Sequence, residues 1–123
     1  MYTLDTNAIL YYIENDPNVV FVVEDIFRNN IPVYISAITE LELFSFTNLN
    51  IADEERIENF IKIVTVIPVE SQIARRAGAL RAQYKLKTPD SAIAATAILT
   101  GSQLVTRNIK DFRKVPHLRL LKI

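Results

Sequence analysis

The sequence contains no cysteine and no tryptophan, and it has two glycines and one histidine. Without cysteine, the chain can form no disulfide framework, no thiolate zinc site and no cysteine nucleophile. The lone histidine, His117, excludes histidine-rich metal sites, and we expect it to be a surface or packing residue. Catalytic chemistry, if present, must therefore come from oxygen and amine groups.

Long apolar runs are also missing. Residues 19–23 form a run of five apolar side chains, and the run around 92–95 spans about eight, against the roughly 18 needed to cross a bilayer. The amino terminus has no basic segment followed by a signal-cleavage pattern. We therefore expect a cytoplasmic protein with no membrane contact.

The composition is that of an ordinary globular domain, with 123 residues, 50% hydrophobic and 23% charged. This length supports one domain with a real apolar core. The glycines and prolines are dispersed, and there is no linker, repeat or low-complexity stretch. We therefore expect a single domain over residues 1–123.

The charges are segregated along the chain although the formal net charge is zero. Residues 1–70 carry 12 acidic and 3 basic residues, a net charge of −9, whereas residues 71–123 carry 2 acidic and 11 basic residues, a net charge of +9. Such asymmetry is a hint of polyanion binding, although the two halves could equally neutralise each other after folding. The two acids of the basic half are Asp90 and Asp111.

Hydrophobic periodicity and capping residues predict alternating strands and helices. Strands are expected at 1–4, 33–35, 64–69, 103–106 and 118–121. Helices are expected at 6–14, 17–29, 38–49, 53–62, 70–86 and 91–100, with a short turn or helix at 108–112. This alternation predicts an α/β fold with a mainly parallel central sheet of four to five strands and helices on both faces.

Ligands of such sheets bind beyond the carboxyl ends of the strands, and polar residues gather in the sequence at these points. They are Asp5, Thr6 and Asn7 after the first strand, Ser36, Thr39, Glu40 and Glu42 after the second, and Thr106, Arg107, Asn108 and Asp111 after the fourth. Asp90 lies in the first turn of the helix that leads into the fourth strand.

Each acid has a simple structural explanation when it is taken alone. Asp5 could be only a helix N-cap, and Glu42 could close a capping box with Thr39. Asp90 could only complement a helix dipole, and Asp111 could be a solvated turn residue. Periodicity does not decide whether Glu40 or Glu42 points inward.

Taken together, the acids are harder to explain as independent caps. Carboxylates gathered at one sheet edge repel each other unless a cation lies between them. With no cysteine and one histidine, that cation must prefer oxygen ligands, which indicates Mg²⁺ or Mn²⁺. Such ions orient phosphate, activate water and stabilise a leaving oxygen, so the pattern points to phosphoryl chemistry.

The segments 4–7, 36–43, 89–97 and 106–112 resemble the four motifs of the PIN-domain nucleases, and most closely those of the VapC-type toxins of prokaryotic toxin–antitoxin pairs. The resemblance covers almost the whole chain, in order. It implies a PIN-like three-layer fold and a metal-dependent endoribonuclease that uses Mg²⁺ or Mn²⁺. It also implies a homodimer and a small antitoxin protein as partner.

The resemblance also assigns the site. Its acid quartet, catalytic and metal-binding, falls on Asp5, Glu42, Asp90 and Asp111, with Glu42 chosen over Glu40 because it lies six residues after Ser36. Asp5, Asp90 and one of the other two would bind one ion directly. The supporting polar positions fall on Thr6, Asn7, Thr106 and Asn108. The chain departs from the pattern at Asn108, where many members have aspartate, and at residues 44–45, Phe-Ser, where a glycine is common.

The basic residues of the second half are candidates for contacts with RNA phosphates. They are Arg75, Arg76, Arg81, Lys85 and Lys87 on or just after one helix, and Arg107, Lys110, Arg113 and Lys114 beside the fourth motif. A solvated helix face is the alternative for each. The surplus apolar side chains of residues 19–23 suggest a dimer or partner contact, or a helix buried on two sides.

Two other functions remain open from the residues. One is a catalytically inactive PIN module that binds RNA or protein. The other is a phosphotransfer or phosphatase domain with an acidic pocket, which is disfavoured because Asp5 is followed by Thr6 and Asn7 rather than by a second acid.

Overall fold

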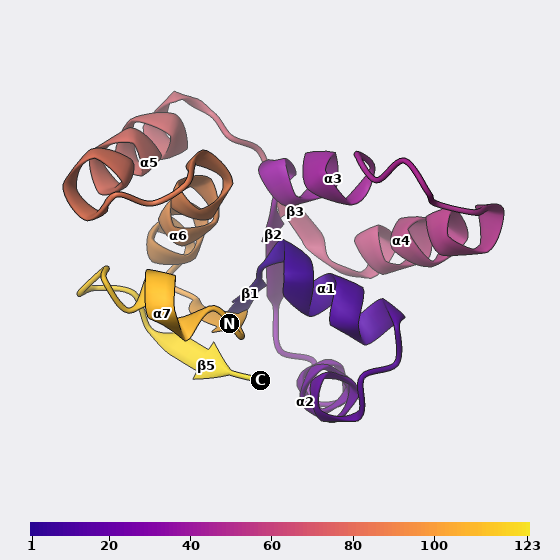
Figure 1. The fold of residues 1–123 in the computed structure, drawn as a ribbon. Helices are drawn as coiled ribbons and strands as arrows, with labels where there is room; N and C mark the ends of the chain where they lie inside the picture. The colour runs from indigo at the N-terminus through magenta and orange to yellow at the C-terminus, as the bar shows by residue number, and fades with distance from the viewer.

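The computed structural model describes residues 1–123, and strands alternate with helices along the chain (Figure 1). The elements are β1 (Tyr2–Leu4), α1 (Thr6–Ile13), α2 (Pro17–Arg28), β2 (Val33–Ser36), α3 (Ala37–Leu43), α4 (Ile51–Ile63), β3 (Thr65–Ile67), α5 (Ser71–Tyr84), α6 (Thr88–Thr100), β4 (Gln103–Thr106), α7 (Ile109–Phe112) and β5 (Leu120–Lys122). None of the helices combines the length and the apolar character needed to span a membrane.

The five strands form one sheet in the order β3-β2-β1-β4-β5, and every neighbouring pair is parallel. The predicted mainly parallel sheet is thus confirmed. β1, the first strand in the sequence, is the central strand of the sheet, between β2 and β4. Because the strands are parallel, their carboxyl ends share one edge, where Asp5, Ser36 and Thr106 lie.

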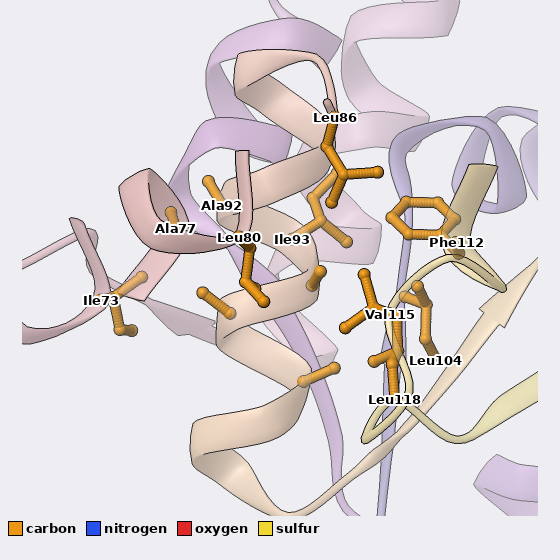
Figure 2. Packing of buried hydrophobic residues seen from close by; sticks show 13 residues of the cluster. Ile73, Ala77, Leu80, Leu86, Ala92, Ile93, Leu104, Phe112, Val115 and Leu118 are labelled. Carbon is orange, nitrogen blue, oxygen red and sulfur yellow. The ribbon is translucent and has the colours of Figure 1, made fainter. Parts of the chain in front are cut away.

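Helices cover both faces of the sheet, so the fold has three layers (Figure 1). One apolar cluster joins α5, α6 and α7 to Leu104 of β4, and Figure 2 shows Leu80, Ile93 and Phe112 in it. The other cluster joins α1, α2 and α4 to the opposite face, where Val105 of the same strand is fully buried. The alternation of Leu104 and Val105 is the period-two pattern of a strand buried on both faces.

Local sequence explains where the helices begin and end. The Asp16 carboxylate accepts hydrogen bonds from the amides of Asn18 and Val19 at the start of α2, and Pro17 occupies the first helical position, where proline is favoured. Gly101 closes α6 in the left-handed region at φ 67°, which glycine adopts without a Cβ clash. Lys85 ends α5 in the same region at φ 57°.

The helix predicted at 38–49 is wrong over its second half, because α3 ends at Leu43 and residues 44–50 are irregular. The amide and the hydroxyl of Ser45 both donate to the carbonyl of Glu42, which closes the helix there. The next helix begins after Asn50 rather than at Asp53. Asn50 is its N-cap, and Asp53 completes a capping box with it.

Other boundaries shift by one to three residues. β3 ends at Ile67, before Pro68, whose missing N–H cannot donate in a sheet. The capping box proposed between Thr39 and Glu42 does not form, because Ser36 caps α3 and Thr39 lies inside the helix. Glu42 is therefore free for another partner.

Candidate functional site

A pocket of about 200 Å³ lies where the carboxyl ends of the strands meet the first turn of α6. It is lined by Asp5, Glu42 and Asp90, which come from three separate parts of the chain. The other residues that line it are Thr6, Asn7, Ser45, Phe46, Ile93 and Asn108. The structure thus brings together three of the four predicted acids and three of the four predicted polar residues.

Asp5 is buried at the end of the central strand, with 5% of its surface exposed. Its Oδ1 accepts a hydrogen bond of 2.8 Å from the Ala8 amide, and its Oδ2 accepts one of 2.5 Å from Thr106 Oγ1. Burial raises the pKa of Asp5 above its ordinary value, although these two hydrogen bonds oppose the rise. Asp5 is therefore both the N-cap of α1 and a member of the pocket.

Glu42, and not Glu40, lines the pocket. Glu42 Oε1 accepts a hydrogen bond of 2.6 Å from Thr6 Oγ1. Thr6 is the residue after Asp5, so one threonine links the first strand end to the second acid. The choice between the two glutamates, which periodicity left open, is resolved geometrically in favour of Glu42 as the pocket residue.

Asp90 is half-buried in the first turn of α6. Its pKa is raised, first by burial and then by the negative charges of Asp5, Asp111 and Glu42, while Lys87 opposes the rise. Each of the other three acids is thus close enough to repel it. The four predicted acids form one electrostatic group.

Asp111 lies beside the pocket rather than in its lining. Asn108 Nδ2 donates to Asp111 Oδ2 at 3.1 Å, and Lys114 Nζ lies 3.6 Å from Oδ1. The hydrogen bond from Asn108 is the main cause of a lowered pKa for Asp111, and Lys114 adds to it. Asn108 therefore orients the Asp111 carboxylate.

The donor chemistry of the pocket fits a hard divalent cation. No basic side chain forms an ion pair with Asp5, Glu42 or Asp90, and the charge of Lys87 offsets only part of the rise in the pKa of Asp90. As the side chains stand, however, no three acidic or histidine groups converge as a metal-ligand set. Thr106 donates a hydrogen bond to Asp5, and Thr6 donates one to Glu42. Each carboxylate keeps further lone pairs, and small side-chain rotations would direct these lone pairs toward an ion.

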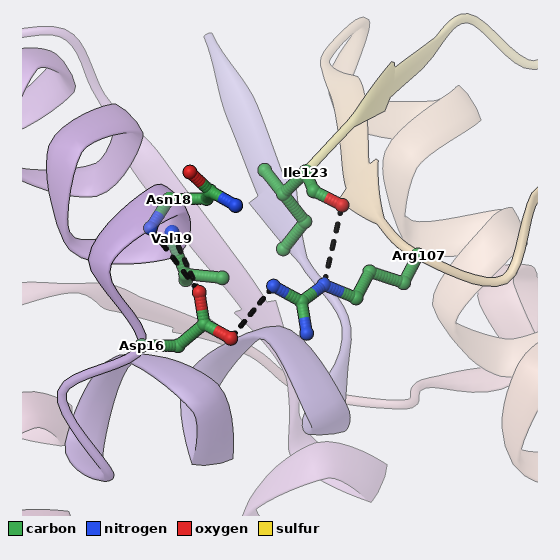
Figure 3. A network of polar contacts seen from close by, with 5 residues as sticks. All are labelled: Asp16, Asn18, Val19, Arg107 and Ile123. Carbon is green, nitrogen blue, oxygen red and sulfur yellow. Dashed lines mark hydrogen bonds and ion pairs between the residues drawn. The ribbon is translucent and has the colours of Figure 1, made fainter.

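Arg107, one of the residues predicted to contact RNA, forms polar contacts with two other parts of the chain (Figure 3). Its Nη2 donates to Asp16 Oδ2 at 2.8 Å, and its Nε donates to the Ile123 carbonyl at 3.2 Å. Its guanidinium carbon lies 4.2 Å from the centre of the Tyr11 ring. These contacts give Arg107 a structural role within the chain, and the prediction that it also contacts RNA stays a prediction.

The other predicted RNA-contacting residues are exposed on the surface. They are Arg75, Arg76, Arg81 and Lys85 on or at the end of α5, Lys87 just before α6, Lys110 on α7, and Arg113 and Lys114 just after it. Arg81 Nε donates to Thr88 Oγ1 at 3.1 Å, which holds it near the start of α6. His117 is also exposed, as expected.

Sequence reasoning missed two residues of the pocket, Phe46 and Ile93, and gave Ser45 no role in it. Ile93 follows Asp90 by three positions on α6, a spacing that puts both on one helix face. Ser45 belongs to the pair 44–45 that departs from the motif after Glu42, and Phe46 follows directly after it. That departure was the only signal in the sequence near these two residues.

The sequence and the fold were compared with those of known proteins. Residues 2–118 match the family model described as PIN domain. A tRNA(fMet)-specific endonuclease VapC from Salmonella typhimurium is 32% identical, over 97% of this chain and 95% of that protein.

Two solved structures are similar to the whole fold. VapBC2 from Rickettsia felis bound to a promoter DNA fragment superposes with a TM-score of 0.84 and 25% identity, over 99% of this chain and 98% of that one. A toxin–antitoxin complex from Klebsiella pneumoniae gives a TM-score of 0.80 and 31% identity, over 98% and 96% of the two chains.

Proposed function

The chain belongs to the PIN domain family, and on this premise we propose that Asp5, Glu42, Asp90 and Asp111 are the catalytic acids with which it hydrolyses RNA. It is a ribonuclease of the VapC type, the toxin of a toxin–antitoxin pair. Its single domain spans residues 1–123 in this proposal.

One observation supports this assignment above all others. Asp5, Glu42 and Asp90 reach one pocket from separate parts of the chain, and no cationic side chain pairs with any of them. Grouped carboxylates repel each other and destabilise a fold unless a bound cation offsets the repulsion. Groups of this kind are found at functional sites, and no contact within the chain requires three acids to lie together here.

The pocket acids would hold Mg²⁺ or Mn²⁺, with Asp5, Asp90 and either Glu42 or Asp111 as direct ligands. Carboxylate oxygens are the ligands both ions prefer. A bound ion of this kind supplies activation of water and stabilisation of the departing oxygen in phosphodiester hydrolysis.

The neighbouring polar residues keep the acids in position. Thr106 and the Ala8 amide fix both oxygens of Asp5, and Thr6 fixes one oxygen of Glu42. Asn108 does the same for Asp111. The hydrogen bond from Asn108 lowers the pKa of Asp111, and those from Thr106 and Ala8 act against the rise that burial causes in the pKa of Asp5. These donors therefore hold the carboxylates in place for a cation.

RNA would approach across the basic residues around the pocket. The charge of Lys87 opposes the rise in the pKa of Asp90, and the charge of Lys110 contributes to the lowered pKa of Asp111. Both lysines therefore lie near pocket acids. Arg75, Arg76, Arg81 and Lys85 extend this surface along α5. Arg107 borders this surface but is paired with Asp16, so we expect it to contribute less to RNA binding than the unpaired cations.

The partner of the toxin is an antitoxin protein, since the similar solved structures are toxin–antitoxin complexes. We propose that this antitoxin is small and that the toxin acts on RNA in the cytoplasm. The chain would act as a homodimer. Phe21 on α2 is 76% exposed, while Val19 and Val23 of the same helix are fully buried. Only part of the apolar run 19–23 is therefore left for a partner or a second copy.

The test is cleavage of tRNA, rRNA and mRNA substrates with Mg²⁺ or Mn²⁺ by the wild type and by Asp90→Asn. We expect the variant to be slower by about 100-fold or more, because a charged ligand is lost. Asp25→Asn on α2 is the matched control, since Asp25 pairs only with Arg28 on the surface, and it should cleave at the wild-type rate.

Two results would contradict the proposal. Equal rates for Asp90→Asn and the wild type would remove Asp90 from the catalytic group. Failure of the wild type to cleave any RNA with either ion, together with no Mn²⁺ binding by calorimetry, would favour an inactive binding module.

A further inference from the structure

Phe46 is the one aromatic residue that lines the acid pocket. It lies in the irregular segment between α3 and α4, and 46% of its surface is exposed. It therefore presents part of an apolar ring to whatever enters the pocket. Neither the acid quartet nor its supporting polar residues account for a ring at this place.

The backbone next to Phe46 is anchored to one of the pocket acids. The amide of Ser45 lies 3.1 Å, and its hydroxyl 2.7 Å, from the carbonyl oxygen of Glu42, to which both donate. The turn that precedes the ring is thus tied to the residue whose side chain lies in the pocket.

Phe46 also lines a second hollow, of about 230 Å³, between the end of α1 and the start of α4. The walls of this hollow include Leu10, Ile13 and Ile57. Its polar members include Glu14, Asn48 and Asp53, and no basic side chain lines it. The hollow therefore repels phosphate, whereas a flat neutral ring with amino groups suits both its walls and its carboxylates.

We propose that Phe46 and this second hollow form a subsite for one unpaired nucleobase of the RNA, beside the phosphate that is cleaved. The proposal rests on the ribonuclease function, because a phosphodiester at the acids brings its neighbouring base to the ring that the two pockets share. Aromatic side chains bind unstacked bases by stacking. Glu14 and Asp53 accept hydrogen bonds from exocyclic amino groups, which adenine, cytosine and guanine carry and uracil lacks.

A base that is paired in a duplex cannot enter such a hollow without being unstacked. The subsite therefore selects single-stranded RNA over duplex RNA. At the position it contacts, it also selects bases with amino groups over uracil.

The first experiment compares Phe46→Leu and Phe46→Tyr in the full chain with short single-stranded RNA substrates. Leucine keeps the apolar bulk and removes the aromatic face, whereas tyrosine keeps the face. We expect Phe46→Leu to raise KM roughly tenfold with kcat nearly unchanged, and Phe46→Tyr to behave as the wild type. Phe44→Leu, at a phenylalanine that is 41% exposed and lines neither hollow, is the matched control and should leave KM and kcat at their wild-type values.

The second experiment separates this proposal from the ribonuclease function. Fluorescence anisotropy measures binding of the same labelled RNA to Asp90→Asn and to Asp90→Asn with Phe46→Leu, so cleavage is not needed. A roughly tenfold loss of affinity in the double variant supports the subsite even if the wild type proves inactive.

Two kinds of result would contradict the proposed subsite. Equal RNA affinity with and without the Phe46 ring, or equal KM for Phe46→Leu and the wild type, overturns the subsite while leaving the nuclease assignment standing. Loss of binding to a protein partner, with unchanged RNA binding, would assign the ring to that partner instead.

Discussion

Arg107 Nη2 lies 2.8 Å from Asp16 Oδ2, an ion pair between residues 91 positions apart in the sequence. Asp16 is also the N-cap of α2, so the pair ties the start of that helix to the end of β4. On either side of Arg107 are Thr106, which holds Asp5, and Asn108, which holds Asp111. The ion pair therefore braces the backbone that positions two of the proposed catalytic acids.

Arg107→Lys should lower the melting temperature by about 3 °C and leave RNA affinity within about twofold of the wild type. Lysine keeps the positive charge but lacks the planar fork that reaches Asp16 and the Ile123 carbonyl together. Thermal melts and fluorescence anisotropy measure the two effects. A large loss of RNA affinity with an unchanged melting temperature would restore Arg107 as an RNA contact.

Lys87→Gln should weaken RNA binding without changing the melting temperature, which is the reverse of the result expected for Arg107→Lys. Lys87 is exposed beside Asp90, so its loss should weaken RNA binding and reduce the slope of log K against log salt by about one. The melting temperature should not change. Lys62→Gln, in the last turn of α4, is the control and should keep the wild-type slope; an unchanged slope for Lys87→Gln would place the RNA elsewhere.

Glu42→Gln should lower the cleavage rate about 100-fold, while Glu40→Gln should lower it less than twofold. The two residues share one helix, and only Glu42 lines the pocket and binds Thr6. Single-turnover cleavage of one RNA substrate measures both variants. Equal losses would show that the substitutions disturb α3 rather than the site.

Asp5→Asn should abolish most activity and yet stabilise the metal-free protein. Burial disfavours the charged form of Asp5 and raises its pKa, and a neutral amide avoids this penalty. The asparagine oxygen can still accept the Ala8 hydrogen bond that caps α1. Urea unfolding in EDTA should give a higher midpoint for Asp5→Asn than for the wild type, and a lower midpoint would mean that the charge is needed for folding.

The stability of the metal-free protein should rise as the pH falls from 7 toward 4. The pKa values of Asp5 and Asp90 lie above 3.8 in the folded protein, so the folded state takes up protons that the unfolded state does not yet bind. Below 3.8 the trend reverses, because the lowered pKa values of Asp16 and Asp111 make the folded state lose stability on protonation. Urea unfolding of the metal-free protein at a series of pH values from 7 to below 3.8 measures this trend. The Asp90→Asn variant should show a smaller rise in unfolding free energy as the pH falls.

Saturating Mn²⁺ should flatten the rise between pH 7 and 5, because a bound cation keeps the acids charged. A metal-free protein whose stability falls steadily from pH 7 would contradict the repulsion among the acids.

The neighbourhood of the acids could be predicted because the signals were local. Asp5 follows a strand and Asp90 opens a helix, and in a parallel sheet those points share one edge. The end of α3 could not be predicted, because Phe44, Phe46 and Leu49 continue its apolar pattern although Phe44 and Phe46 are exposed. Periodicity records which side chains are apolar and not whether they are buried.

The role of Arg107 could not be predicted for a different reason. Its position beside the fourth motif is the same whether it binds RNA or another residue of the chain. Asp16 can be explained from the sequence as the N-cap of a helix. The sequence near Asp16 and the sequence near Arg107 therefore give no indication that the two residues form an ion pair. Only the folded chain brings them together.

The hydrogen bond from Thr106 to Asp5 spans 101 residues, and this has a consequence for synthesis on the ribosome. Chains emerge amino terminus first, so the central strand must wait for β4 before its carboxylate gains that partner. A nascent chain that ends before residue 103 carries Asp5, Glu42 and Asp90 but lacks the strand that completes their pocket. Cleavage of cellular RNA would therefore begin only after almost the whole chain has been translated.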